Sequence, residues 1–122
     1  MILLDSNILI YSVQKEHEDL RQWILSIEPG YSIISKVEVL GYWNLSPAQA
    51  QAITNILKSM RELPITTKQC ERAIALRQDK KMSLGDALIA ATALDHELSL
   101  ATRNSKDFVW IPNLSLINPF DI

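Results

Sequence analysis

Short apolar runs alternate with longer segments of helical periodicity along the 122-residue chain. Apolar and β-branched runs predict strands at residues 1–4, 31–35, 62–66 and 114–119, and a further strand together with its turn within residues 99–104. Between these runs, apolar residues recur every three or four positions, which is typical of helices. Helices are expected over residues 7–14, 16–27, 36–45, 47–60, 68–79 and 84–98. Because strands and helices alternate, the sequence predicts an α/β sandwich with a mostly parallel central sheet, in a single domain of residues 1–122.

The starts of three predicted helices carry residues that favour helix initiation. Ser46 stands before Pro47, and serine followed by proline at the first helical position is a common start. Thr67 and Ser83 are expected to be the N-caps of the two later helices, because their hydroxyl groups can accept a hydrogen bond from an unpaired helix amide. Pro119 is expected to close a last strand at the edge of the sheet.

Charge and composition exclude several classes of protein. The net charge is −2, so the chain lacks the general excess of Lys and Arg with which many proteins bind nucleic acid. Any contact with nucleic acid has to come from a local group of basic residues. The one cysteine, Cys70, excludes an intrachain disulfide and fits a reducing cytoplasm. No segment reaches the roughly 20 apolar residues that span a bilayer, and Asp5 interrupts the first apolar run before it attains signal-peptide length. We expect a cytoplasmic protein with no membrane contact.

Four acidic residues stand beside apolar residues rather than in the charged stretches of the chain. Asp5 follows the first predicted strand, Glu38 lies between two valines, Asp86 opens an apolar helix and Asp107 precedes Phe108. A carboxylate in such a setting costs free energy unless a partner satisfies it. These four residues are therefore the candidates for a functional site.

Helix capping is the alternative explanation for three of the acids. Ser35 with Glu38, and Ser83 with Asp86, both match the capping box, in which the acid reaches back to an unpaired amide. Asp5 could likewise cap the helix that follows it.

The predicted sheet favours a shared site for the same three acids. If the strands are parallel, Asp5 and Glu38 follow two strands at their carboxyl ends, and Asp86 starts a buried helix near that edge, where ligand crevices form. Convergent carboxylates repel one another unless cations share them, and such oxygen ligands suit Mg²⁺ or Mn²⁺. Two ions about 3.5 to 4 Å apart can support an in-line displacement at phosphorus. The pattern predicts metal-dependent phosphodiester hydrolysis, which a chelator should abolish.

The segment ATRNSKDF, residues 101–108, adds polar groups near that edge. Thr102, Asn104 and Asp107 are expected in the loop after the late strand, where they could bind water or phosphate. Arg103 is a cation close by, and we expect it and Asn7 to contact phosphate or RNA. The alternative is a polar turn with an Asx-type hydrogen bond.

Four sequence blocks resemble the signature blocks of PIN-domain ribonucleases, in the same order. They are LLDSN at residues 3–7, SKVEVLG at 35–41, LGDALIAATAL at 84–94 and ATRNSKDF at 101–108. Within that family the chain looks most like the short VapC-type toxins of toxin–antitoxin pairs. The resemblance covers essentially the whole chain.

The resemblance implies an α/β/α sandwich and an endoribonuclease that depends on Mg²⁺ or Mn²⁺. It also implies a homodimer and neutralisation by a small VapB-like antitoxin whose tail blocks the acidic site. Carried over by position, Asp5, Glu38 and Asp86 match the three core acids. Asn104 and Asp107 compete for the fourth acidic position. We favour Asp107 as the acid, with Asn104 placing water or phosphate.

A catalytically silent module of the same fold, binding RNA or a protein, is the main functional alternative. A haloacid-dehalogenase-like phosphatase needs an aspartate where Asn7 stands, and a receiver domain needs paired acids after the first strand, so neither fits. Lys80 and Lys81 are expected at a solvated helix end, with RNA steering as the alternative. Trp110 is expected in the core or at a dimer contact, with base stacking as the alternative.

Overall fold

Five parallel strands form the central sheet of the computed structural model, which describes residues 1–121. The strands are β1 (Ile2–Leu4), β2 (Gly30–Ser32), β3 (Arg61–Leu63), β4 (Ser99–Ala101) and β5 (Leu116–Ile117). Their order across the sheet is β3-β2-β1-β4-β5, and each neighbouring pair is parallel. The predicted α/β architecture is confirmed, with a sheet that is parallel throughout rather than mostly parallel.

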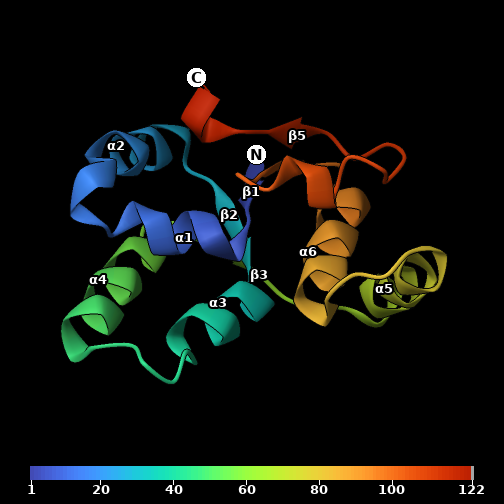
Figure 1. Cartoon of the computed structure of the whole chain (residues 1–122), viewed down its shortest axis with the longest axis horizontal. Helices are drawn as coiled ribbons and strands as arrows, with labels where there is room; N and C mark the ends of the chain where they lie inside the picture. The colour runs from blue at the N-terminus through green and yellow to red at the C-terminus, as the bar shows by residue number, and fades with distance from the viewer. Residues whose placement is uncertain (122) are drawn as a thin grey trace.

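Helices connect the strands and cover both faces of the sheet (Figure 1). The α-helices are α1 (Ser6–Ser12), α2 (Glu18–Ile27), α3 (Ile33–Leu40), α4 (Pro47–Leu57), α5 (Thr67–Asp79) and α6 (Leu84–Asp95). Short 3-10 helices are η1 (Lys15–His17), η2 (Ser105–Asp107) and η3 (Pro119–Asp121). Within residues 1–121, no helix combines the length and the apolar character needed to cross a membrane.

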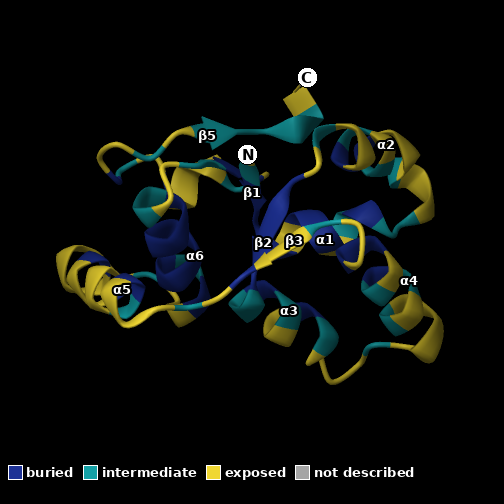
Figure 2. Ribbon diagram, turned by 180° about the vertical axis from the view of Figure 1, so that it is seen from behind, coloured by how far each residue is buried: buried dark blue, intermediate teal, exposed yellow. Residues whose placement is uncertain are grey.

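Alternate residues of the strands point into two separate cores, as the pleat of a strand requires. Leu4 and Ala101 pack with side chains of α1, α2 and α4 on one face of the sheet. Leu3 and Leu100 pack with side chains of α5 and α6 on the other face. All four residues are fully buried. Figure 2 shows β2 in dark blue between the helical layers, whereas the edge strands β3 and β5 are yellow and teal. The result is an α/β/α sandwich in which β1 is covered on both sides.

The boundary between β2 and α3 differs from the sequence prediction. The strand predicted over residues 31–35 ends at Ser32, and residues 33–35 already belong to α3. The hydroxyl of Ser32 accepts a hydrogen bond from the amide of Ile34, which caps the helix earlier than the apolar pattern suggests. The helix then ends at Leu40, not at residue 45.

Two of the three predicted caps are confirmed and one was wrong by a residue. Ser46 caps α4 and Ser83 caps α6. The cap of α5 is Thr66, not Thr67, because the hydroxyl of Thr66 accepts a hydrogen bond from the amide of Gln69 at 3.2 Å. The side chain of Gln69 returns a bond to the amide of Thr66, which completes a capping box that Thr67 could not form.

Candidate active site

Asp5 stands at the carboxyl end of β1, the middle strand of the sheet, and it is buried. Its Oδ1 accepts a hydrogen bond from the amide of Ser6 at 2.8 Å, and its Oδ2 accepts one from the hydroxyl of Thr102 at 2.9 Å. Thr102 lies at the same edge because Leu4 pairs with Ala101 across β1 and β4. Asp5 is also the N-cap of α1, as the capping alternative predicted.

Glu38 reaches the same edge from α3. Its Oε1 accepts a hydrogen bond from the hydroxyl of Ser6 at 2.7 Å, and the hydroxyl oxygens of Ser6 and Ser35 lie 3.0 Å apart. Ser35 and Glu38 both lie inside α3, so the capping box predicted between them is not formed. The Glu38 carboxylate instead accepts its hydrogen bond from Ser6, the residue next to Asp5.

The first turn of α6 packs directly against Glu38. A Cβ atom built on Gly85 would lie 2.3 Å from Oε2 of Glu38, so only glycine leaves room for the carboxylate here. The Glu38 carboxylate thus lies beside the amino-terminal end of α6, where the helix dipole favours a negative charge. Asp86 follows directly, and its amide donates a hydrogen bond to the hydroxyl of Ser83 at 3.1 Å. This bond is the amide half of the capping box predicted for these two residues.

Asp107 lies in η2 and is exposed. Burial raises the pKa of Asp86, and the charges of Asp107 and Glu38 raise it further, so these carboxylates act on one another. Asn104, the competitor for the fourth position, immediately precedes η2. The backbone amide of Asn104 donates a hydrogen bond to the hydroxyl of Thr102 at 3.0 Å. This bond connects the loop to Thr102, the residue that also binds Asp5.

Burial and repulsion together raise the pKa of Asp5 from 3.8 to about 6. Loss of hydration is the largest cause, and the charges of Asp86 and Glu38 add to it. The hydrogen bonds from Thr102 and Ser6 oppose the rise because they stabilise the ionised carboxylate. The carboxyl end of β1 therefore carries an excess of negative charge that the protein only partly offsets.

The donor set suits a divalent cation. Every candidate ligand is a carboxylate oxygen, the donor that Mg²⁺ and Mn²⁺ prefer. No ion pair within residues 1–121 includes any of these four acids, so no protein cation neutralises them. As the side chains stand, no three His, Cys, Asp or Glu residues in the described part of the chain are gathered tightly enough to hold an ion. A bound ion would have to draw the carboxylates closer, and its charge would offset the repulsion that raises the pKa of Asp5 and of Asp86.

The structure also places Asn7 and Arg103, two of the predicted RNA-contacting residues. Asn7 is exposed in the first turn of α1. The guanidinium carbon of Arg103 lies 4.3 Å from the ring centre of Phe120 and 5.1 Å from that of Tyr11. The structure thus brings Asp5, Thr102 and the other acids together, whereas the Arg103 side chain packs on two aromatic rings.

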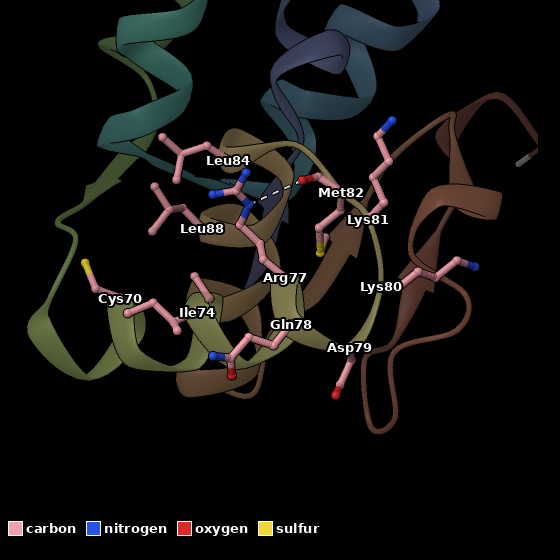
Figure 3. Close-up of a pocket in the computed structure, with 11 residues that line it drawn as sticks. Cys70, Ile74, Arg77, Gln78, Asp79, Lys80, Lys81, Met82, Leu84 and Leu88 are labelled. Atoms are coloured by element: carbon pink, nitrogen blue, oxygen red, sulfur yellow. Dashed lines mark hydrogen bonds between the residues drawn. The ribbon is translucent and has the colours of Figure 1, made fainter.

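Two surface hollows meet near the start of α6. The larger, about 810 Å³, lies between α5 and α6, and Figure 3 shows Cys70, Ile74 and Leu88 among its lining residues. The second, about 520 Å³, is lined by Asp86 and Asp107. Because two of the four carboxylates line it, the second hollow is the candidate active-site cleft.

Sequence reasoning missed the residues that hold the carboxylates in place. Ser6 and Ser35 form the hydrogen-bonded chain to Glu38, and Gly85 leaves the space for it. A glycine inside a helical pattern, directly before Asp86, is a sequence signal of close packing. The two serines carry no comparable signal, because serine is common at caps and turns.

Comparison with known proteins identifies the family. The sequence profile of the PIN domain matches residues 2–111. The chain belongs to the PIN domain family. This confirms the resemblance carried by the four sequence blocks.

Relatives of this PIN domain are found among both curated sequences and solved structures. It is 33% identical over 119 residues to Ribonuclease VapC10 of Mycobacterium tuberculosis, a match that covers 90% of this chain and 84% of that protein. It is 34% identical to a chain of a toxin-antitoxin complex from Klebsiella pneumoniae, with a TM-score of 0.78 and complete coverage of both chains. VapBC2 from Rickettsia felis, solved with a DNA fragment from its promoter, shares the fold at a TM-score of 0.81 and 24% identity, over 97% of this chain and 98% of that one.

Proposed function

We propose that this PIN domain, as a single unit of residues 1–122, is a metal-dependent endoribonuclease and the toxin of a toxin–antitoxin pair. One observation carries the proposal: Asp5, Glu38 and Asp86 come from three separate elements and act on one another without a protein cation between them. Structural acids are usually paired or solvated, whereas catalytic ones are often strongly perturbed. The relative named as a ribonuclease supports the same activity.

The four acids are assigned as ligands of Mg²⁺ or Mn²⁺ and as the catalytic residues. They are Asp5, Glu38, Asp86 and Asp107. When bound, the ion supplies the positive charge that activates a water molecule and offsets the charge of the phosphate. The chain's own contribution is to orient the carboxylates through the hydroxyls of Thr102 and Ser6 and through the space left at Gly85.

The polar residues around the acids are assigned to the substrate. Asn104, next to η2, places water or phosphate, and Asn7, Thr102 and Arg103 contact the phosphate or RNA. In the hydrolysis, a water oxygen bonds to phosphorus, one ester P–O bond breaks, and the leaving oxygen takes up a proton.

A VapB-like antitoxin is the proposed protein partner, and the proposed assembly is a cytoplasmic homodimer. The similarity to a chain of the Klebsiella toxin-antitoxin complex, at 34% identity over the whole chain, supports the pairing. The mass of the purified chain in solution, measured by light scattering, tests the homodimer directly. A mass of one chain at all concentrations would contradict it.

A catalytically silent PIN-like module that binds RNA or a protein is the second candidate. One observation favours it: Asp5 caps α1 through the amide of Ser6, so this acid also has a purely structural task. An N-cap tolerates asparagine well, whereas a metal ligand does not. Substitution of the acids by their amides therefore separates the two functions.

Cleavage of a mixed pool of structured RNA tests the proposed nuclease. Purified wild type is compared with Asp86→Asn in Mg²⁺, in Mn²⁺ and in chelator, and Asp19→Asn is the control for an exposed acid outside the site. We expect discrete products from wild type and the control in either metal, and none in chelator or from Asp86→Asn. No cleavage by folded, antitoxin-free wild type in metal would favour the silent module.

A further inference from the structure

We propose that the hollow beside Asp86 and Asp107 seats the single-stranded RNA nucleotide next to the scissile phosphate, with Trp110 against its base and Lys80, Lys81 and Lys106 on the flanking phosphates. This inference rests on the proposed nuclease function and adds a substrate-binding site to it. The eight residues around the hollow are Lys80, Lys81, Met82, Ser83, Asp86, Lys106, Asp107 and Trp110.

The hollow has the size and the charge distribution of a nucleotide site. Its volume of about 520 Å³ lies within the range of roughly 300 to 1,000 Å³ that is usual for small-ligand pockets. Its lining combines the two carboxylates of the candidate cleft with three lysines. When one phosphate of an RNA strand lies at the two carboxylates, the neighbouring phosphates of that RNA would therefore lie near the three lysines.

The three lysines are not held by acids of the described chain, although the ammonium of Lys80 lies over the Trp110 ring. No ion pair within the described chain, residues 1–121, involves Lys80, Lys81 or Lys106, although Asp86 and Asp107 line the same hollow. Lys80 and Lys81 extend from the side of their loop opposite to Cys70, and Lys80 points toward the C-terminal segment (Figure 3). The net charge of the whole chain is negative, so these lysines form a local site of the kind that a weakly acidic protein needs for RNA.

Trp110 lines the hollow, and the one polar group of its side chain is already bonded. Its indole N–H already donates to the carbonyl oxygen of Asp107 at 3.0 Å, which fixes the ring and satisfies its one donor. The other side of the residue packs against the core under α6, and the Nζ of Lys80 lies 5.6 Å from the ring centre. A fixed aromatic ring with cations beside it is an arrangement on which unpaired bases stack, the base taking the place of the Lys80 ammonium over the ring, and a paired base in a duplex could not reach it.

Binding of a fluorescein-labelled, mixed-sequence single-stranded RNA tests this site. All variants are made in an Asp5→Asn parent, because Asp5 lies outside the hollow and its loss should prevent cleavage of the RNA. The affinity of each protein for the RNA is measured by fluorescence anisotropy in Mg²⁺ over a series of salt concentrations. Into this parent we introduce Lys80→Ala with Lys81→Ala, or Lys106→Ala, or Trp110→Leu. The matched controls are Lys15→Ala with Lys58→Ala, from η1 and the C-cap of α4; α4 covers the face of the sheet opposite to α5 and α6 (Figure 1).

The lysine variants should lower both the affinity and its salt dependence. The slope of log affinity against log salt should flatten by about 0.7 for each phosphate that a lysine no longer neutralises, and it should stay unchanged in the controls. Trp110→Leu should bind about tenfold more weakly, and Trp110→Phe should recover most of that loss because it keeps the aromatic face. Thermal unfolding of each variant confirms that it is folded.

Several results would overturn the proposal. Equal slopes for the hollow and control lysine variants would do so, and so would an unchanged affinity in Trp110→Leu. Cleavage by wild type, run in parallel, distinguishes the two levels of failure. If wild type cleaves RNA while the hollow variants bind like the parent, only this site is wrong; if wild type cleaves nothing and the parent binds no RNA, the nuclease function is wrong as well.

Discussion

The hydroxyl of Thr102 donates a 2.9 Å hydrogen bond to the carboxylate of Asp5, joining residues that are 97 positions apart in the chain. The bond exists because β1 and β4 are parallel neighbours, so the residues that follow them meet at one edge. It favours the ionised form of Asp5 in a setting where burial and neighbouring charges favour the protonated form. Thr102 thus acts on the chemistry of the site through Asp5.

Replacement of Thr102 by valine should shift the pH dependence of RNA cleavage. The variant keeps the shape of the side chain but loses the hydroxyl donor, so the pKa of Asp5 should rise further above about 6. The acid limb of the pH–rate profile should then move to higher pH. Thr102→Ser, which keeps a hydroxyl, should retain the wild-type limb. Identical profiles for the valine variant and wild type would show that the bond does not tune Asp5.

Without a divalent ion, Asp5 should make folding less favourable as the pH rises. Its pKa is 3.8 when unfolded and about 6 when folded, so the folded chain holds the proton more tightly between those values. Stability is therefore lost as the pH rises from about 4 to 6, by an amount on the order of 3 kcal/mol at one pKa unit per 1.36 kcal/mol. Asp86, whose pKa is also raised, contributes in the same direction.

The metal-free Asp5→Asn variant should therefore be more stable than wild type at pH 7.5, by roughly 1 to 3 kcal/mol. The difference should shrink toward zero near pH 3, where the wild-type carboxyl is largely protonated in both states. Urea unfolding in chelator at the two pH values measures it. A variant that is less stable than wild type at pH 7.5 would indicate that the cap formed by Asp5 outweighs the repulsion.

Gly85→Ala should impair cleavage while leaving the chain folded. The new methyl group would lie 2.3 Å from Oε2 of Glu38 and must push the carboxylate aside. Alanine is the better helix former by about 1 kcal/mol, which offsets part of the crowding. We expect the cleavage rate to fall at least about tenfold, because misplacing a catalytic group by about 1 Å can cost a factor of a hundred.

A double-mutant cycle shows whether Gly85 acts through Glu38. Residues that act as one unit are not additive, so Gly85→Ala should lower the rate little further in a Glu38→Gln background. The rates of the two single variants and the double variant complete the cycle. Fully additive losses would place the effect of Gly85 elsewhere.

Arg103→Ala should lower the free energy of unfolding by about 0.5 to 1 kcal/mol, the usual value of an exposed cation–π contact. Its guanidinium packs on the rings of Phe120 and Tyr11, so the change loosens the packing between the C-terminal η3 and α1. Arg103→Lys should recover part of the loss. Urea unfolding measures both variants, and an alanine variant as stable as wild type would contradict the stabilising role of these rings.

Much of the fold follows from local patterns in the sequence. The apolar run ending at Asp5 and the proline after Ser46 each carry a direct physical signal for an element or its boundary. The end of β2 could not be predicted in this way, because Ile33 and Ile34 are β-branched and continue the strand pattern, and only the cap formed by Ser32 ends the strand. The sequence pattern alone could not show that Ser32, rather than Ser35, caps α3.

The acids of the candidate site were accessible to sequence reasoning, because each stands beside apolar residues rather than in a charged stretch. Their supports were not, since they depend on which elements meet in space. Ser6 reaches Glu38 only because α1 and α3 pack at the same edge of the sheet, and Gly85 matters only because Glu38 lies above it. The lysines around Trp110 likewise form a site only once the loop before α6 is placed beside η2.

Mn²⁺ binding to the purified chain, followed by the electron paramagnetic resonance signal of the free ion, shows whether Asp5, Glu38, Asp86 and Asp107 hold a divalent cation. Wild type and the control Asp19→Asn should bind Mn²⁺ alike at neutral pH, and Asp86→Asn should bind it at least about tenfold more weakly, because a charged oxygen ligand is removed. Equal Mn²⁺ binding by wild type and a folded Asp86→Asn variant would contradict the account.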